Sequence, residues 1–451
     1  MFFVRFVACV HRSASKHIAY QPFARLASRS LSTAGVMSPP TPGLAQFLAE
    51  SKANYLKDIQ DGKGKDWTIV MGNEAGDLDS LASAIGYAWF RSAILKDTAI
   101  SLIQTPRPDL CLRAENLYAL ELAGLNASTQ DLLCIDDIPS SSTFPSTKFA
   151  LVDHNRLQTR FTEGNPESRV IGILDHHEDE GHHKDADPRV IVVPTGSAAS
   201  LVARHLCEKC PDDIPKELST LLLCAILVDT NGLKPGGKAE QIDREAAAYL
   251  TPRSLLFSPD NLTASELHDE PRLQELSAAL QSKKGDVSHL GTRDLLRRDY
   301  KEYAFTPSWL PNKTIHVGLA SVPIGLHPWI SMDKSFWSSA EQWMADRNLA
   351  ALGILTSFRD EKKLNKHGKP KHRREQLFIV REDVEDLAER LFKGLKHSEE
   401  LDLKKRSLAD DYRTEAPSSF AKRYRAKVWE QGNNDATRKV TAPLVKRIIE
   451  G

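Results

Sequence analysis

Apolar and polar positions follow two alternating patterns along the first half of the chain. Solid apolar runs of strand length lie at residues 67–71, 99–103, 149–152, 170–174 and 190–193. Between such runs, residues 44–60 and 80–96 carry apolar side chains at helical spacing. Strands that are apolar on both sides and alternate with helices predict an α/β fold, in which helices cover both faces of a parallel sheet.

The pattern changes at residues 252–262, where Pro, Ser and Asn cluster and charged helices begin. We therefore expect two domains, over residues 37–257 and 258–451. The second contains expected helices at 264–282 and 292–303 and apolar runs at 314–321, 349–356 and 376–380. The charged segment 359–374 contains Gly and Pro, so we expect a hairpin loop between two strands. A solvated loop is the favoured interpretation, and a phosphate-contacting loop that includes Arg374 stays open.

Polar residues stand directly after several apolar runs. Those that follow the runs ending at 71, 152 and 174 are Asn73, Asp77 and Asp79, then Asp153, then Asp175, His176 and His177. Asp229 follows a further apolar run at 221–228, and we place it at a strand end as well. Because the carboxyl ends of parallel strands meet at one edge of a sheet, we expect these side chains to form one site.

Each of these aspartates alone is best interpreted as a turn or helix-cap residue, but together they predict a metal site. Carboxylates gathered at the ends of buried elements repel one another unless cations lie among them. Asp77 and Asp79 can face one pocket from an extended segment. Adjacent histidines diverge, so one of His176 and His177 can bind metal while the other faces substrate, and Asp153 can bridge two cations. Such ligands suit Mg²⁺ or Mn²⁺, with Co²⁺ as a further candidate.

A pair of divalent cations in such a site performs metal-assisted hydrolysis of a phosphoryl group. The sequence contains neither a Gly-x-Ser-x-Gly elbow nor a P-loop lysine motif, so it gives little support to serine hydrolases or P-loop nucleotide enzymes. Gly196-Ser197 precedes an expected helix whose free amides could face an anion; a simple N-cap is an equally good interpretation.

The formal net charge of zero conceals an uneven distribution. Residues 1–36 contain five basic residues and no acidic one, which leaves 55 basic and 60 acidic residues, a net charge of −5, in the rest. A mildly acidic body gives no support for nucleic-acid binding. The Arg- and Ser-rich start is typical of a mitochondrial presequence, and a start at Met37 would give a cytoplasmic form. A disordered extension without a targeting role is the alternative interpretation.

Two further classes receive no support from the sequence. No stretch approaches about 20 consecutive apolar residues, so we expect no membrane span. Six cysteines in a chain of this size indicate no disulfide framework, and we interpret Cys207-x-x-Cys210 as structural.

Four motifs in order resemble those of the DHH phosphoesterase superfamily, which is named for the triplet at 175–177. They are Gly72–Ser80, Val152–Asn155, Leu174–His177, and Asp229-Thr230 after its helix. The resemblance implies an active site in the cleft between the parallel-sheet domain and a smaller C-terminal α/β domain with a mixed sheet. Arg297–Lys301 and Thr437–Lys439 are similar to motifs of the branch that contains family II inorganic pyrophosphatases, prune-like proteins and fungal exopolyphosphatases.

Residue by residue, the resemblance implies two divalent cations and a cationic substrate site. Asn73, Asp77 and Asp153 would hold one cation, and Asp79, Asp153, His176 and Asp229 would hold the other. Asp153 and His177 are the expected catalytic residues, and His177 would contact substrate or assist proton transfer to the leaving group. The expected phosphate ligands are Lys301, Arg438 and Lys439, with Arg374 as a further candidate.

Asn73 departs from the pyrophosphatase pattern, which has histidine at this position. A neutral carbonyl oxygen is a harder and weaker ligand than imidazole, so we expect a weaker first metal site and a shift toward Mg²⁺. The asparagine and the terminal Thr-Arg-Lys are similar to the fungal exopolyphosphatase form, although prune-like proteins share the asparagine.

We therefore predict a monomeric exopolyphosphatase that acts on inorganic polyphosphate. The alternatives are a pyrophosphatase or a prune-like hydrolase of short polyphosphates or nucleotides, and, from another class, a non-catalytic interaction protein on the same fold. We also expect that deletion of residues 436–451 impairs substrate binding more than folding.

Overall fold

The computed structural model describes residues 43–125, 130–140, 143–257, 263–364, 368, 370–406 and 418–451. The expected presequence and the alternative start at Met37 lie outside these residues. Within them, no helix has the length and apolar character that crossing a membrane requires.

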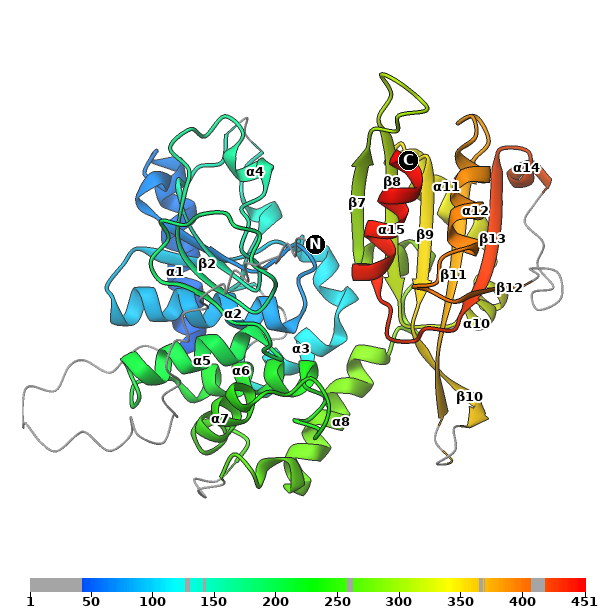
Figure 1. Cartoon of the computed structure of the whole chain (residues 1–451). Helices are drawn as coiled ribbons and strands as arrows, with labels where there is room; N and C mark the ends of the chain where they lie inside the picture. Colours follow the sequence, from blue (N-terminus) through cyan, green and yellow to red (C-terminus); the bar gives the residue numbers. More distant parts are fainter. Residues whose placement is uncertain are drawn as a thin grey trace, which may run out of the picture.

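The first half of the chain builds a six-stranded parallel sheet (Figure 1), which confirms the fold class predicted from the sequence. The strand order is β3(Leu133–Cys134)-β2(Ala99–Ile103)-β1(Thr68–Met71)-β4(Lys148–Val152)-β5(Arg169–Asp175)-β6(Arg189–Ile191), and each neighbouring pair is parallel. The winding direction reverses between β1 and β4. Loops that leave the carboxyl ends of these two strands diverge, and this divergence opens a crevice at the edge of the sheet.

Helices cover both faces of this sheet because alternate strand residues point to opposite sides. On one side, Val70 and Ala150 pack against α2(Leu78–Trp89), α3(Ala114–Leu122), α5(Ala198–Lys209), α6(Lys216–Asp229) and α7(Gln241–Leu250). On the other side, Ile69 and Phe149 pack with Tyr55 of α1(Leu44–Gln60) and Phe161 of α4(Thr159–Thr162).

The second half forms a seven-stranded mixed sheet. Its order is β12(Leu403–Arg406)-β13(Tyr424–Gln431)-β11(Pro370–Arg381)-β9(Ala351–Thr356)-β8(Ile315–Val322)-β7(Tyr300–Phe305), and β10(Phe358–Leu364) pairs with β11. The β8–β9 pair is parallel and the other pairs are antiparallel. Figure 1 shows β7 at the edge of this sheet that faces the first half, with α8(Pro271–Gly285) leading from one half to the other.

Helices also cover both faces of the second sheet. One face packs against α9(Thr292–Arg298), α10(Leu326–Met332), α11(Phe336–Asp346) and α14(Ser418–Ala421). The other face packs against α12(Leu387–Lys396) and α15(Arg438–Glu450). Helix α15 buries Leu444, Val445 and Ile449 in this core, which argues against the expectation that deletion of residues 436–451 would impair substrate binding more than folding. The domain boundary at residues 257/258 stays a prediction.

Two expectations about element type are wrong. The run 221–228 belongs to helix α6, which corrects the strand end inferred from its apolar pattern and confirms the helix that the family motif places before Asp229. A helix buried on all sides is apolar all round and resembles a buried strand in sequence. The helix expected over 292–303 ends at Arg298, and Tyr300–Phe305 pairs with β8 as an antiparallel strand. Lys301 consequently lies on a strand. The charged segment 359–374 is a hairpin, as expected, although β10 and β11 occupy much of it.

Candidate metal centre and substrate pocket

The loop after β1 turns sharply into α2, and two glycines permit the turn. A Cβ on Gly72 would overlap Ser80 of the helix, so only glycine allows this close approach. Gly76 has a φ of 60°, which glycine adopts without strain. The turn makes Asp77 the N-cap of α2, where its carboxylate accepts a hydrogen bond from the Ser80 amide at 3.1 Å, and it places Asp79 in the first helical turn.

Asp79 is buried and lies against the N-terminus of α5. Its carboxylate accepts hydrogen bonds from the Ser197 hydroxyl at 2.8 Å and from the amides of Ala198 and Ala199 at 2.7 and 2.8 Å. The anion at this helix start is therefore a carboxylate of the chain itself. Even so, the pKa of Asp79 lies well above its usual value, because burial and the charges of Asp153 and Asp229 disfavour ionisation.

Asp153 follows β4 and lies at the centre of the site. Its backbone has a φ of 60°, a conformation that is rare for residues other than glycine and that recurs at functional sites. The Oδ2 atom accepts hydrogen bonds from the Ser80 hydroxyl at 2.6 Å and from Nδ2 of Asn73 at 2.7 Å. The Oδ1 atom lies 3.1 Å from Nε2 of His176. Asp153 thus joins the loops that follow β1, β4 and β5.

The amide of Asn73 faces Asp153 with its nitrogen. Its Nδ2 donates to the carboxylate and to the main-chain oxygen of Asp153, while its Oδ1 accepts from the amide of Ala75 at 2.9 Å. Rotating the amide by half a turn would oppose acceptor to acceptor and donor to donor at these contacts. In this arrangement Asn73 positions Asp153, and its assignment as a metal ligand stays a prediction.

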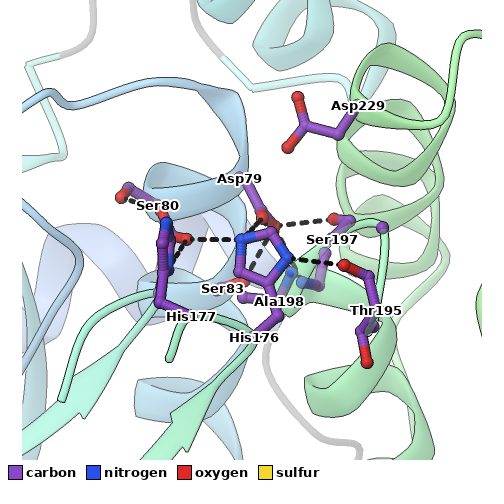
Figure 2. A network of polar contacts seen from close by, with 12 residues as sticks. Asp79, Ser80, Ser83, His176, His177, Thr195, Ser197, Ala198 and Asp229 are labelled. Carbon is purple, nitrogen blue, oxygen red and sulfur yellow. Dashed lines mark hydrogen bonds and ion pairs between the residues drawn. The ribbon is translucent and has the colours of Figure 1, made fainter. Parts of the chain in front are cut away.

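The two histidines of the triplet point in different directions, as Figure 2 shows. His176 Nε2 lies 3.1 Å from Asp153 and 3.7 Å from Asp79, and its Nδ1 lies 3.0 Å from the carbonyl oxygen of Thr195. A proton held on Nδ1 by that carbonyl leaves Nε2 available to a metal. Burial lowers the pKa of His176, but the hydrogen bond to Asp153 and the charge of Asp79 outweigh it and raise the pKa to about 10.

Asp175 holds the histidines in place and is itself fully buried. Its Oδ1 accepts from both histidine amides and lies 2.9 Å from Nδ1 of His177, and its Oδ2 accepts from Asn155 at 2.6 Å. Burial raises its pKa, yet these donors and the His177 ring outweigh burial and lower the pKa overall. With its oxygens occupied in this way, Asp175 acts as a positioning residue for His177.

Asp229 ends α6 and lies across from Asp79 (Figure 2). The Nζ atom of Lys284, from α8, lies 3.5 Å from its carboxylate. Burial raises the pKa of Asp229; Lys284 lowers it, and the charges of Asp77 and Asp153 raise it further. The sequence analysis did not identify Lys284, because no local motif relates residues that lie 55 positions apart.

This set of donors fits divalent cations. Ligand atoms of Asp153, His176 and His177 all lie within 4.8 Å of one another. Burial and repulsion from neighbouring carboxylates raise the pKa of Asp79 and of Asp229, and the charge of a divalent cation would oppose both effects. Carboxylate oxygens with one imidazole nitrogen match the preferences of Mg²⁺ and Mn²⁺. All the predicted metal ligands lie in this region.

A cavity of about 740 Å³ opens between the two halves beside this centre. Asp153 and His177 line it from the first half, and Lys301 lines it from β7. Lys301 Nζ lies 3.4 Å from Glu74, a residue that the sequence analysis passed over although it lies within the first motif. Burial raises the pKa of Glu74, but Lys301 and neighbouring hydrogen bonds lower it below the usual value.

Three of the predicted phosphate ligands do not line this cavity. Arg438 pairs with Asp299 at 2.7 Å and donates to the main-chain oxygen of the same residue at 2.8 Å. Arg374 donates to the main-chain oxygen of Asn434 at 2.7 Å, and Lys439 is exposed. Their roles in substrate binding stay predictions.

Comparisons with known proteins agree with this architecture. Residues 67–226 match the DHH family, N-terminal domain, and residues 278–448 match the DHHA2 domain. The chain is 33% identical over 310 residues to a Schizosaccharomyces pombe protein named "Putative exopolyphosphatase", covering 65% of this chain and 74% of that one. It is 29% identical over 256 residues to the Rattus norvegicus protein named "Exopolyphosphatase PRUNE1", covering 55% of this chain and 52% of that one.

A relative and a solved structure extend the comparison to a second type of protein. A Shouchella clausii protein named "Probable manganese-dependent inorganic pyrophosphatase" is 29% identical over 184 residues, covering 41% of this chain and 53% of that one. The crystal structure of a Methanococcus jannaschii "putative family II inorganic pyrophosphatase" covers 85% of this chain and 100% of its own, with a TM-score of 0.50 at 19% identity. At that identity the likeness concerns the fold.

The two family models span both halves of the chain, and the DHH match at residues 67–226 includes Asp79, Asp153 and the two histidines described above. The chain therefore belongs to the DHH phosphoesterase superfamily, in the branch of the exopolyphosphatases, prune-like proteins and family II pyrophosphatases, and it is a hydrolase.

Proposed function

We propose that this hydrolase is an exopolyphosphatase, which releases orthophosphate from the end of inorganic polyphosphate. The observation that carries the proposal is the cavity between the halves, where Asp153 and His177 face Lys301. Its volume of about 740 Å³ falls in the range that holds ligands much larger than pyrophosphate. The names of the fungal and PRUNE1 relatives support the same substrate class.

The residues of the site suggest how the protein acts on the end of a polyphosphate chain. Asp79, Asp153, His176 and Asp229 would hold divalent cations, with Asp77 nearby. When bound, such cations neutralise charge on the phosphoryl group and lower the pKa of a bound water. Ser80 and Asn73 hold the Asp153 carboxylate in a fixed orientation through the hydrogen bonds to its Oδ2.

On the substrate side, His177 and Lys301 complete the site. The Nδ1 atom of His177 faces the Asp175 carboxylate, which stabilises the doubly protonated ring, and Nε2–H of that imidazolium would give its proton to the leaving phosphate oxygen. Lys301 offers an ammonium group to a phosphate at the end of the polyphosphate chain. These assignments give each half of the molecule a separate task.

Rates on three substrates test the proposal. The purified full chain, supplied with Mg²⁺ or Mn²⁺, is offered long-chain polyphosphate, tripolyphosphate and pyrophosphate, and released orthophosphate is measured. We expect release from long chains with a higher kcat/KM than from pyrophosphate. Failure to release orthophosphate from long polyphosphate would refute the proposal. A preference for pyrophosphate would instead favour the activity named for the Shouchella clausii relative.

A further inference from the structure

Three Lys and Arg side chains line the cavity between the halves, and each has a carboxylate partner. The pairs are Arg156 with Glu180 at 3.7 Å, Arg347 with Glu302 at 3.9 Å, and Lys301 with Glu74 at 3.4 Å. In the first two pairs both members come from the same half of the molecule. The third pair joins the loop after β1 to strand β7 of the other half.

Glu74 is held in place from several sides. Its Oε1 faces Lys301, and its Oε2 accepts a hydrogen bond from Nε2 of Gln158 at 2.6 Å. The next residue in the loop, Ala75, is also fixed, because its carbonyl oxygen accepts from Arg113 at 2.6 Å. The side chains of Glu74 and Lys301 are each 39% exposed, so an incoming anion can reach the pair.

We propose that Glu74 is an internal counter-ion of Lys301 that a substrate phosphate must displace, and that it thereby limits how tightly the site holds phosphate. This inference rests on the proposed function, since it assigns the displaced place to a phosphate of the polyphosphate chain. The ammonium of Lys301 is a compact charge that either anion satisfies. A polyphosphate end carries more negative charge than a carboxylate, so it is attracted to the ammonium more strongly and displaces Glu74. A single orthophosphate carries less charge and displaces Glu74 less readily.

The exchange has a direction that suits turnover. After cleavage, Glu74 competes with orthophosphate for Lys301 and assists its release, while a long chain keeps its remaining contacts. Removal of the Glu74 charge should therefore tighten the binding of both substrate and product.

The variant Glu74→Gln tests this inference, because it keeps the shape of the side chain and removes its charge. Steady-state hydrolysis of tripolyphosphate at low salt should show a KM lower by about two- to fivefold, the range for an ion pair of this exposure. The gain should appear in KM and not in kcat, inhibition by orthophosphate should strengthen, and high salt should shrink both effects. An unchanged or raised KM would overturn the inference.

A matched control makes the same change away from the cavity. Glu167 is exposed and pairs with Lys65 at 2.9 Å, so Glu167→Gln removes one surface charge without touching the site and should leave KM unchanged. An equal fall in KM in this control would show that net charge alone is responsible and would overturn the inference.

A second background separates displacement from general repulsion. In a Lys301→Met protein the counter-ion has no partner, so adding Glu74→Gln should lower KM far less than it does with the lysine present. An equal gain in both backgrounds would refute the role assigned to Glu74.

The inference and the proposed function fail in different ways. If the wild-type protein releases no orthophosphate, the proposed exopolyphosphatase activity is refuted. If Glu74→Gln hydrolyses tripolyphosphate normally with the wild-type KM, only the counter-ion role of Glu74 is refuted. Calorimetric binding of tripolyphosphate to the two metal-free proteins, kept in chelator, repeats the comparison without hydrolysis, and an equal affinity of the two proteins there would also overturn the inference.

Discussion

Asp175 places its Oδ1 atom 2.9 Å from Nδ1 of His177 and, with the same atom, accepts hydrogen bonds from the backbone amides of both histidines. One buried carboxylate thus fixes the ring of His177 and the backbone that carries His176. The first residue of the triplet thus supports the other two.

We expect Asp175→Asn to lower kcat by about 10- to 100-fold, the usual effect of removing a group that orients a ligand or catalytic ring. The change leaves Asn155 opposite another amide in place of a carboxylate and weakens the hold on the His177 ring. Steady-state kinetics on tripolyphosphate would measure this loss, with a smaller change in KM.

The control for this prediction is Asp179→Asn in the same loop. Asp179 accepts from Arg189 at 2.6 Å and is partly exposed, so its replacement should leave kcat within about twofold. Equal rates for the Asp175→Asn protein and wild type would contradict the positioning role.

Asp153→Ala should abolish hydrolysis. Asp153 contacts Ser80, Asn73 and His176 at once, so its loss should cost more than about 100-fold, beyond the effect of residues one layer further out. The same variant should lose the rise in melting temperature that divalent cations produce in the wild type. Full hydrolysis by this variant would remove the assigned site.

Divalent cations should stabilise the protein, because they relieve repulsion among buried carboxylates. At 100 times the dissociation constant, binding contributes about 2.7 kcal/mol, which corresponds to a rise in Tm of about 5–10 °C. Differential scanning calorimetry with and without a chelator would measure the shift. No shift with Mg²⁺ or Mn²⁺ would contradict the metal centre.

Asp229→Asn should make the metal-free protein more stable by about 0.5–1 kcal/mol. A carboxylate at the C-terminal end of α6 opposes the helix dipole, and the raised pKa of Asp229, caused first by burial, shows that its charge is disfavoured there. The variant should also gain less stability from added metal than the wild type. Lower stability of the metal-free variant would show that the pair with Lys284 outweighs these costs.

The ion pair of Arg438 and Asp299 should make the stability of the protein depend on pH. Burial raises the pKa of Asp299, but Arg438 and the nearby Arg113 outweigh it and hold the pKa below the usual value. A lowered folded-state pKa contributes stability above the unfolded pKa of about 4, and that stability is lost as pH falls through the folded value.

Asp299→Asn should therefore cost about 1.5–3 kcal/mol at pH 7, the range for hydrogen bonds to charged groups, and less at about pH 3, below the unfolded pKa. Urea unfolding at the two pH values measures the difference. Asp212→Asn, at an exposed position of the first half, is the control and should cost little at either pH. A cost independent of pH would contradict the ion-pair assignment.

A chain that ends at Asp435 should fail to fold its second half. Each large buried side chain of α15, such as Leu444 and Ile449, contributes about 2–5 kcal/mol, and their sum approaches the whole stability of a typical domain. Circular dichroism and size-exclusion chromatography would detect the loss. Lys439→Ala is the informative partner variant, because Lys439 is exposed; it should fold normally and reveal through KM whether the lysine binds phosphate.

The sequence predicts the first sheet well because its signal is local. Five solid apolar runs correspond to five of its six strands, and the polar residues after three of them do meet at one edge. The pattern does not predict β3, because a strand of two residues is too short to give a periodic signal. The apolar pattern alone puts Asp229 at a strand end, because a fully buried helix such as α6 shows no polar face, whereas the family motif gives the helix correctly.

Other features of the site depend on contacts that the sequence does not encode locally. The hydrogen bond from Ser197 to Asp79 joins residues 118 positions apart, and the position of Lys301 depends on pairing between β7 and β8. Glu74 was passed over for a similar reason, since its partner comes from the other half of the chain. Local pattern thus predicted which candidate metal ligands lie together better than it predicted the substrate side.

Lys301 belongs to an edge strand that pairs residue by residue with β8, opposite Leu319. An edge strand that is hydrogen-bonded along its length cannot slide by itself. The ammonium group of Lys301 can therefore approach Asp153 only by extension of its own side chain or by rigid-body movement of the second sheet. The width of the opening between the halves consequently limits the thickness of the polyanion that both halves can contact at once.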